Sequence, residues 1–306
     1  MSQRSDILPN VVCPRCQSTI AATDGEIKAA TNYSECLRRC QSCGIGFSNA
    51  ISSPTVIYRY PEQNVPEQVR EGVLESLKQS LNEQHRADKI SKFGFSTSED
   101  ALTWTVFSHL RRTGQLHTAM RSCVTPEANS SPLALLLWGA PYPLDSPEGS
   151  RMRQQLITIC DHLGEEKTCR SEPDVAVDFG DAGVVLIEVK YRSGNDRKRF
   201  GDRYNRYVRE TDAFSDVAAV GRSELYELTR NWRIGVELAG GRPFALVNLV
   251  IKDSDPARTE EFRAGLNPKR GQFLVLRWPG FVAGFQQPDW LKSYLARRLS
   301  SGGCKA

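Results

Sequence analysis

Four cysteines near the N-terminus constrain the fold of this chain more than any other feature. They form two Cys-x2-Cys pairs, Cys13 with Cys16 and Cys40 with Cys43, and 23 residues separate the pairs. Each pair can place two thiolates on one ion, and four thiolates complete the tetrahedral shell of zinc. Because that shell leaves no position for water or substrate, the spacing predicts structural Zn²⁺ and not a catalytic metal.

The segment around these cysteines, residues 1–53, is short and rich in turns, so it can bury little apolar surface. Metal binding would then supply most of its folding free energy. The segment resembles a zinc ribbon, with CPRC and CQSCGIGF as its two metal-binding turns. Cys36 lies in the same segment and could replace Cys40 as a ligand, at a less usual spacing.

The composition of the whole chain is that of an ordinary folded protein. It has 306 residues, of which 40% are apolar and 25% charged, with a net charge of +4. No apolar run approaches the ~18 residues that a membrane-spanning helix needs. The N-terminal sequence MSQRSDILPN lacks the apolar core of a signal peptide. We therefore expect a cytoplasmic protein that binds no membrane and keeps its thiols reduced.

The remaining chain divides into a connector, a large domain and a tail. Residues 54–91 are expected to form a linker and one amphipathic connecting helix, because apolar residues recur at helical spacing from Val69 to Leu81. Residues 92–300 alternate between helical and strand patterns, which predicts one α/β domain. Residues 301–306 are expected to be a disordered tail. Helices are predicted near 96–114, 146–166, 200–230, 256–266 and 287–299, and strands near 132–141, 173–178, 184–192, 244–252 and 272–278.

A predicted β-hairpin at residues 173–192 carries charged residues where apolar ones would be expected. The turn FGDAG separates PDVAVD from VVLIEVKYR. A turn centred near Asp181 places Asp174 opposite Glu188. Strand alternation puts Glu188 and Lys190 on one face, so the three charged groups can converge at one end of the hairpin.

Two carboxylates packed this closely repel each other unless a cation compensates. Oxygen ligands with no nearby histidine favour Mg²⁺ or Mn²⁺, and a lysine beside such an ion can orient water or offset phosphate charge. Asp178 is a rival for the role of Asp174, but in this register it would face Val184, far from Glu188. The alternative to a metal site is a set of charges on an edge strand.

Pro173-Asp174 followed by Glu188-Val189-Lys190 resembles the signature of the PD-(D/E)xK nucleases. This superfamily includes restriction endonucleases and many repair and phage-defence nucleases. The resemblance covers about residues 95–255 and implies a restriction-endonuclease-like mixed sheet flanked by helices. It also implies that Asp174, Glu188 and the Val189 carbonyl bind the metal, and that Lys190 acts on water or phosphate.

The family often has a further acid on its first core helix. Glu99, in the first turn of the helix predicted at 96–114, matches that role and would bind the metal directly or through water. A first-turn acid is also favoured by the helix dipole alone. The strand and helix at 133–163 depart from the family pattern, so three other acids compete with Glu99: Glu148, Glu165 and Glu166.

A basic segment follows the hairpin directly. Between Tyr191 and Arg209 the chain has seven basic residues and two acids. We expect this segment to hold the phosphate backbone of DNA, a contact that weakens with salt. The residues proposed for that contact are Arg192, Arg197, Lys198, Arg199 and Arg203.

Together these features predict a metal-dependent DNA endonuclease that hydrolyses phosphodiester bonds. Family analogy suggests restriction or anti-phage defence. The expected partners are DNA and either a second copy of the chain or a partner protein of a defence system. The alternative is a non-catalytic protein that binds nucleic acid, or an adaptor that docks a partner through its zinc ribbon.

Overall fold

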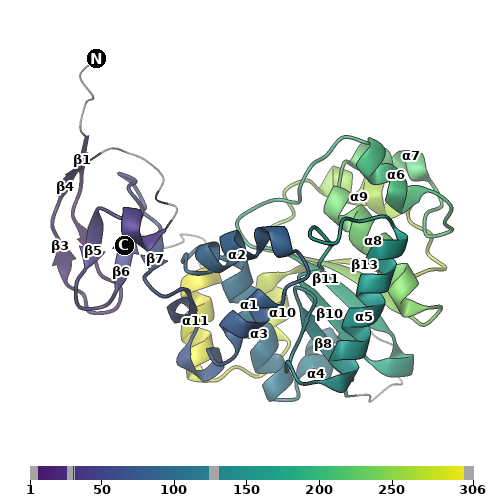
Figure 1. The fold of residues 1–306 in the computed structure, drawn as a ribbon, viewed down its shortest axis with the longest axis horizontal. Helices are drawn as coiled ribbons and strands as arrows, with labels where there is room; N and C mark the ends of the chain where they lie inside the picture. The colour runs from purple at the N-terminus through teal and green to yellow at the C-terminus, as the bar shows by residue number, and fades with distance from the viewer. Residues whose placement is uncertain (1–5, 26–29, 31, 124–130, 300–306) are drawn as a thin grey trace. The chain divides into compact units, whose positions relative to one another are not determined.

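The computed structural model describes residues 6–25, 30, 32–123 and 131–299 (Figure 1). The chain divides into two compact units, the first made of Met1–Leu74, Ala87–Thr105 and Gln287–Ala306, and the second of Glu75–Arg86 and Val106–Gln286. The domain boundaries expected from the sequence, at residues 53, 91 and 300, stay predictions. The predicted tail, residues 301–306, lies outside the described residues. None of the described helices has the length and apolar content needed to cross a membrane.

The N-terminal part of the first unit consists of short antiparallel strands. Two pairs are β1 (Asp6–Leu8) with β4 (Thr23–Gly25) and β2 (Val11–Val12) with β3 (Thr19–Ile20). A three-stranded sheet follows, with β6 (Ile45–Phe47) between β5 (Arg38–Cys40) and β7 (Val56–Tyr58). Strands of two or three residues bury little apolar area, so this part needs other sources of stability.

One such source is the buried guanidinium of Arg38, which is 0% exposed. It donates hydrogen bonds of 2.7–2.8 Å to the carbonyl oxygens of Pro9, Ser48 and Ala50. These bonds tie β5 to two loops, one between β1 and β2 and one between β6 and β7. A buried charge with several acceptors is far less costly than an unpaired one.

The connecting segment is not one helix, so that prediction was wrong. Its chain turns at Gly72, where φ is +76°, and the helix that follows ends at Lys78. The apolar residues Val69, Val73, Leu77 and Leu81 are all buried. Val69 ends one short helix, Val73 and Leu77 lie in the next, and Leu81 lies in a bend after it. The short helices of this segment are η2 (Pro61–Asn64), η3 (Glu67–Val69), α1 (Val73–Lys78), η4 (Glu83–His85) and α2 (Arg86–Phe93), and η1 (Tyr33–Glu35) comes earlier in the chain.

The second unit is built on a six-stranded mixed sheet with the order β13-β12-β11-β10-β8-β9. β10 runs antiparallel to β8 and β11, whereas β11, β12 and β13 are parallel to one another. The predicted mixed α/β sheet is therefore confirmed. The strands are β8 (Ala134–Leu137), β9 (Ala140–Pro141), β10 (Val175–Asp178), β11 (Val184–Lys190), β12 (Phe244–Val250) and β13 (Gln272–Arg277). The strand predicted at 132–141 is thus a short hairpin of β8 and β9.

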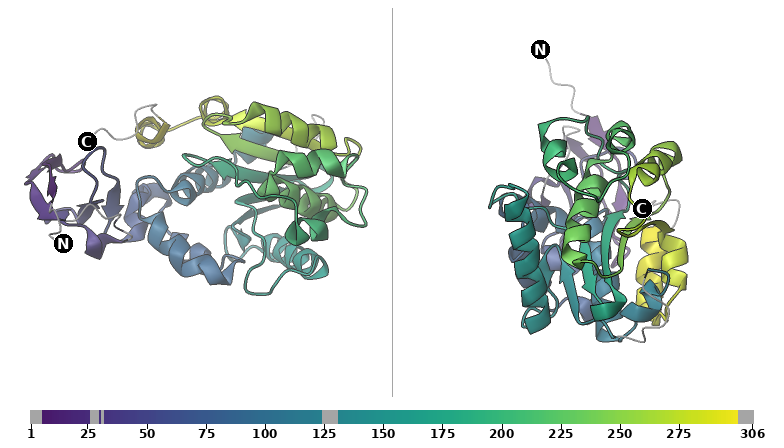
Figure 2. Two further views of the ribbon diagram at one scale, coloured as in Figure 1. Left: turned by 90° about the horizontal axis from the view of Figure 1, so that it is seen from above. Right: turned by 90° about the vertical axis from the view of Figure 1, so that its right-hand side faces the viewer.

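Helices flank this sheet (Figure 2). α8 (Tyr226–Ala239) packs against β11 and β12, and α5 (Pro147–His162) packs against β8. Trp232 of α8 and Phe244 of β12 lie in the same buried core cluster. The other helices are α3 (Glu99–Arg112), α4 (Leu116–Met120), η5 (Gly180–Ala182), α6 (Asp202–Val208), α7 (Val217–Ser223), α9 (Pro256–Gly265), α10 (Trp278–Ala283) and α11 (Asp289–Leu299). The segment predicted as helical at 200–230 therefore contains two short helices and the start of a third, and α10 was not predicted.

Candidate functional site

The hairpin of β10 and β11 has the predicted register. Val175 pairs with Ile187 and Asp178 pairs with Val184. Continued by one residue, this register places Asp174 opposite Glu188. Asp178 instead forms an ion pair with Arg242, at 2.8 Å, and accepts the backbone N–H of Gly180. The structure therefore gives Asp178 a role in closing the turn.

β11 is a central strand, between β10 and β12, and all seven of its residues are buried. The edge-strand alternative is therefore wrong. Glu188 is 3% exposed and Lys190 is 8% exposed, although both carry ionisable groups. Charges buried this deeply need partners, because their loss of hydration is otherwise uncompensated.

Helix α8 supplies two of those partners, and sequence analysis missed both. The Nζ atom of Lys190 lies 2.7 Å from Glu188 Oε1 and 2.8 Å from Glu227 Oε2. Asn231 Nδ2 donates to Glu188 Oε2 at 2.7 Å. Glu227 and Asn231 are four residues apart, so one face of α8 presents both toward β11. Their polar character inside an otherwise buried helix was the available signal, but it did not indicate which strand they would meet.

Asp174 contacts the backbone of β11. Its Oδ2 atom accepts the N–H of Val189 at 2.8 Å. In an antiparallel pair the N–H and C=O of one residue point to the same side of the strand. The Val189 carbonyl therefore points to the side on which Asp174 lies, and its predicted role as a metal ligand stays a prediction.

A buried amide lies beside Glu188 on the neighbouring strand. Asn248 of β12 pairs in register with Glu188 and is 0% exposed. Within the described residues, neither Oδ1 nor Nδ2 of Asn248 has a hydrogen-bond partner. A buried amide without hydrogen-bond partners destabilises the folded protein unless water, an ion or a ligand group supplies them.

The charges in this cluster shift one another's pKa values. Burial, together with the negative charges of Asp174 and Glu227, raises the pKa of the Glu188 carboxyl to about 8, although Lys190 opposes the shift. Burial alone would also raise the pKa of Glu227, but the positive charges of Lys190 and Arg230 hold it below its usual value. Burial would lower the pKa of Arg230, but Glu188 and Glu227 outweigh it and raise that pKa.

Arg230 links this cluster electrostatically to a second buried carboxylate, that of Glu165. Glu165 accepts hydrogen bonds from the Ser171 backbone and hydroxyl groups, at 2.5 and 2.6 Å, and from the Tyr207 hydroxyl at 2.7 Å. Of the acids that competed with Glu99, Glu165 is thus the one that belongs to the same buried network.

The other acids proposed for the site lie elsewhere. Glu148 pairs with Arg151 on α5 at 3.0 Å, and Glu166 is exposed. Glu99 lies in the first turn of α3, as expected, and belongs to the first compact unit. Asp174 and Glu188 belong to the second unit. The role of Glu99 therefore stays a prediction.

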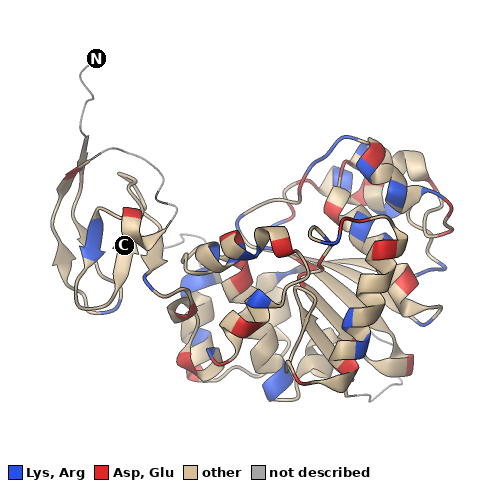
Figure 3. Cartoon of the chain, in the orientation of Figure 1, with Lys and Arg blue, Asp and Glu red and all other residues tan. Residues whose placement is uncertain are grey.

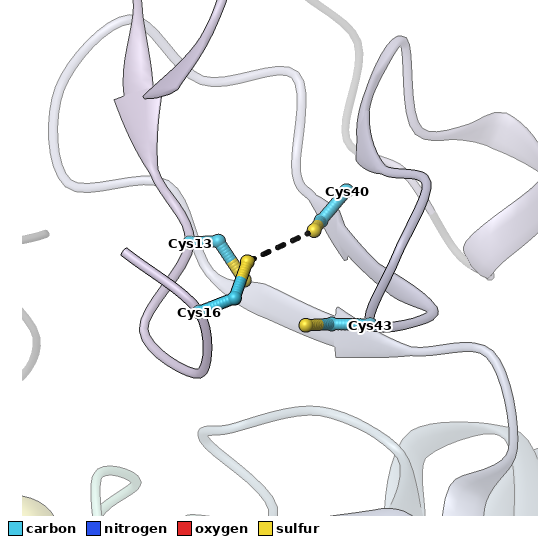
Figure 4. A group of neighbouring side chains, drawn as sticks. All are labelled: Cys13, Cys16, Cys40 and Cys43. Carbon is cyan, nitrogen blue, oxygen red and sulfur yellow. Dashed lines mark hydrogen bonds between the residues drawn. The ribbon is translucent and has the colours of Figure 1, made fainter. Parts of the chain in front are cut away.

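The four cysteines of the two Cys-x2-Cys pairs form one cluster (Figure 4). Their Sγ atoms all lie within 4.8 Å of one another, and those of Cys16 and Cys40 are 3.5 Å apart. A tetrahedral zinc site with Zn–S bonds of ~2.3 Å requires sulfur–sulfur distances of about 3.8 Å. The cluster therefore fits a zinc ion. Among the described residues, no other group of three or more His, Cys, Asp or Glu residues is close enough to hold a metal.

Both cysteine turns have the same backbone form. The residue after the second cysteine is left-handed in each, with φ of +61° at Gln17 and +62° at Gly44. In the first turn the N–H of Gln17 returns to the carbonyl of Cys13 at 2.9 Å. Cys36 is buried in a separate cluster with Ala30 and Ile57, so Cys40 and not Cys36 completes the set of four.

The basic segment after β11 lies on the surface. The side chains proposed to contact DNA are exposed, and two of them form ion pairs within the described residues. Arg197 pairs with Asp255 and Lys198 pairs with Asp196, each at 3.0 Å. Figure 3 shows Lys and Arg on α6 and in the loops beside it, interspersed with acids. The positive charge of this segment is therefore partly neutralised by the protein itself.

No protein-family model matches the sequence, and neither the curated proteins nor the solved structures compared with it give a match. The geometry of the two sites is therefore the basis for a functional assignment.

Proposed function

We propose that this protein is a metal-dependent DNA endonuclease of the PD-(D/E)xK type that carries a structural zinc ribbon. The observation that supports this function is the set of half-buried Asp174 and buried Glu188 and Lys190 around the carboxyl end of the central strand β11. In open α/β sheets, ligands bind outside the carboxyl ends of the strands. Acids and a lysine at such a place suit a divalent cation and a phosphate.

Two further features favour a cation at this place. The network contains more acids than bases, with four carboxylates, of Asp174, Glu188, Glu227 and Glu165, against Lys190 and Arg230. The surrounding acids, together with burial, raise the pKa of Glu188 so that it keeps its proton at neutral pH, and a bound cation would favour its ionised form. The Asn248 amide also lies beside Glu188 without a partner among the described residues.

Asp174, Glu188 and the Val189 carbonyl would hold Mg²⁺ or Mn²⁺, with Glu99 as a further ligand directly or through water. The ion would supply Lewis-acid stabilisation of the charge that develops on the phosphodiester. Lys190 then orients the attacking water or offsets phosphate charge. Because Glu227 also holds Lys190, the lysine keeps a partner when Glu188 turns to the cation.

The other parts of the chain have supporting roles in this proposal. Cys13, Cys16, Cys40 and Cys43 hold Zn²⁺, which stabilises the N-terminal strands and leaves no ligand position for chemistry. The exposed basic segment holds the DNA backbone. A role in cytoplasmic restriction or anti-phage defence, with a homodimer or a defence-system partner, rests on family analogy alone.

The test is cleavage of supercoiled plasmid with Mg²⁺ or Mn²⁺ by the wild type and by Asp174→Asn and Lys190→Met. Both changes keep the approximate size of the side chain, which limits the risk of unfolding. Asp178→Asn is the matched control, because it alters an acid of the same hairpin that pairs with Arg242. We expect the wild type and the control to nick or linearise the plasmid, and the two site variants to lose at least about 100-fold in rate.

Equal cleavage by all four proteins would place the activity outside this site. Absence of cleavage in every protein, with both metals, would contradict the endonuclease function on this substrate.

One observation favours a second candidate, a nucleic-acid-binding protein that does not cleave. Lys190 already bonds two carboxylates, and such a closed network can serve only to fix the packing of α8 on β11. This candidate requires salt-dependent DNA binding without cleavage. It also requires a thermal stability that Mg²⁺ leaves unchanged, because no cation would bind the folded state.

A further inference from the structure

Phe200 is an exposed aromatic side chain within the basic segment. It is 44% exposed and directly follows Arg197, Lys198 and Arg199 in the sequence. A single exposed apolar residue needs no explanation by itself. The surroundings of this ring, however, give it a defined orientation and a positive environment.

The ring of Phe200 is held from within the second unit. It stacks on Tyr204 of α6, with ring centroids 5.1 Å apart and planes inclined by 27°. Tyr204 is buried and contacts Tyr226 edge-on at 5.2 Å. Phe200 is therefore the outermost of three rings in successive contact, and the other two, Tyr204 and Tyr226, are buried.

Helix α7 holds the edge of the ring. A Cβ atom at Gly221 would lie 2.8 Å from Cδ2 of Phe200, a distance that real contacts do not reach. The glycine therefore allows α7 to approach the ring closely. Contacts with both α6 and α7 fix the plane of an exposed ring, which lowers the entropy lost when a second ring stacks on it.

Two of the nearest cations are available for a ligand. Arg199 and Arg203 are exposed, and neither forms an ion pair within the part of the chain that the structure describes. Arg199 precedes Phe200 directly, and Arg203 precedes Tyr204, the residue on which Phe200 stacks. Exposed arginines thus adjoin both Phe200 and Tyr204 in the sequence, and such side chains can bind the phosphates next to a stacked base.

We propose that Phe200 is a stacking platform for an unpaired base of single-stranded DNA, with Arg199 and Arg203 binding its neighbouring phosphates. This inference rests on the proposal that the protein acts on DNA. In duplex DNA the faces of the bases are already covered by their neighbours, so a fixed surface ring can contact only an unpaired or displaced base. The site would therefore favour DNA with single-stranded regions.

The test compares binding of a single-stranded oligodeoxynucleotide and of a duplex of the same length. It omits Mg²⁺ and Mn²⁺, so the DNA stays intact, and it avoids chelators that would remove zinc. Phe200→Leu keeps an apolar contact with Tyr204 but removes the aromatic face, and Phe200→Trp keeps the face. Val217→Ala, at an exposed apolar residue of α7, controls for a general surface effect.

For Phe200→Leu we expect about tenfold weaker binding of the single strand, little change for the duplex and an unchanged salt dependence. Phe200→Trp and Val217→Ala should bind as tightly as the wild type or, for Trp, more tightly. Arg199→Gln or Arg203→Gln should instead lower the slope of log K against log salt by about 0.7. This contrast separates stacking from phosphate contact.

The inference is overturned if Phe200→Leu binds the single strand as tightly as the wild type, if it loses duplex binding equally, or if the wild type binds no single strand. The result is independent of cleavage. Phe200-dependent binding without any nuclease activity would refute the endonuclease and leave the platform standing. Plasmid cleavage that depends on Lys190, together with unchanged binding by Phe200→Leu, would refute the platform alone.

Discussion

Two buried asparagines next to Glu188, Asn231 on α8 and Asn248 on β12, show how strongly the effect of one side chain depends on its hydrogen-bond partners. Asn231 and Asn248 are both 0% exposed, but only Asn231 has a partner, the Oε2 atom of Glu188 at 2.7 Å. Asn248 lies beside Glu188 on the next strand without one among the described residues. The same amide group therefore stabilises the folded protein at one position and destabilises it at the other.

Replacing each asparagine by leucine should change stability in opposite directions. Asn231→Leu leaves the buried Glu188 oxygen without its donor, so we expect a loss of about 2–3 kcal/mol in unfolding free energy. Asn248→Leu removes an amide without a partner, so we expect a gain of about 1 kcal/mol. Urea unfolding of the second unit measures both. Equal losses at the two positions would show that Asn248 is satisfied in solution.

The raised pKa of Glu188 predicts how stability depends on pH. Because the native state keeps this proton to a higher pH than the unfolded chain, it binds more protons between the usual carboxyl pKa and about 8. Stability should therefore fall as pH rises through that range and level off above it. Glu188→Gln should lack this fall, and Mg²⁺ should reduce it in the wild type. A wild-type stability curve parallel to that of Glu188→Gln would contradict the shift.

The elements differ in how far the sequence could predict them. The hairpin of β10 and β11 was predictable because a short turn determines the register of both strands, and hence the pairing of Asp174 with Glu188. The contact of α8 with β11 was not, because Glu227 and Asn231 are about forty residues away from Glu188 in the sequence. Helical spacing was also misleading around Val69 and Leu81, where a turn at Gly72 interrupts an apolar pattern that extends across it.

The two cysteine turns allow a matched test of an element. Both place a left-handed residue after the second cysteine, Gln17 in one and Gly44 in the other. Gly44→Ala introduces a Cβ where it is unfavourable, so we expect about 1 kcal/mol less stability in the N-terminal strands. Gln17→Gly relieves the same strain and should be neutral or slightly stabilising. Competition with a chromophoric zinc chelator reports both changes as shifts in metal affinity.

For the whole molecule, sequence patterns predicted the cysteine cluster and the mixed sheet. They did not predict which segments of the chain belong to which compact unit. The Cys-x2-Cys spacing is local and predicted the four clustered thiols, and strand patterns predicted the mixed sheet. Assignment of α11 to the first unit depends on distant contacts. Arg298 donates to the Asn64 side chain at 2.6 Å, and the Tyr294 hydroxyl donates to the Ala101 carbonyl at 3.2 Å. Local patterns contain no information about such pairs.

Metal removal should separate the behaviour of the two units. Cys40→Ser removes a ligand, so we expect loss of bound zinc and of amide protection in β5 and β6, with the six-stranded sheet unaffected. Cys36→Ser is the control, because Cys36 is buried outside the cluster and zinc should stay at one ion per chain. Elemental analysis and hydrogen exchange measure both effects. If Cys36→Ser lost zinc and Cys40→Ser kept it, Cys36 and not Cys40 would be the ligand.

The first unit is made of segments that precede and follow parts of the second unit in the sequence, which has a consequence for the order of folding during synthesis. All residues of the second unit, which ends at Gln286, leave the ribosome before α11 does. The sheet can therefore form while the protein is still being translated, as domains generally do. Asn64 and Ala101, the partners of Arg298 and Tyr294, stay exposed to chaperones and proteases until α11 has been synthesised. Translation pauses within the codons for α11 would lengthen that vulnerable interval for residues made before most of the second unit.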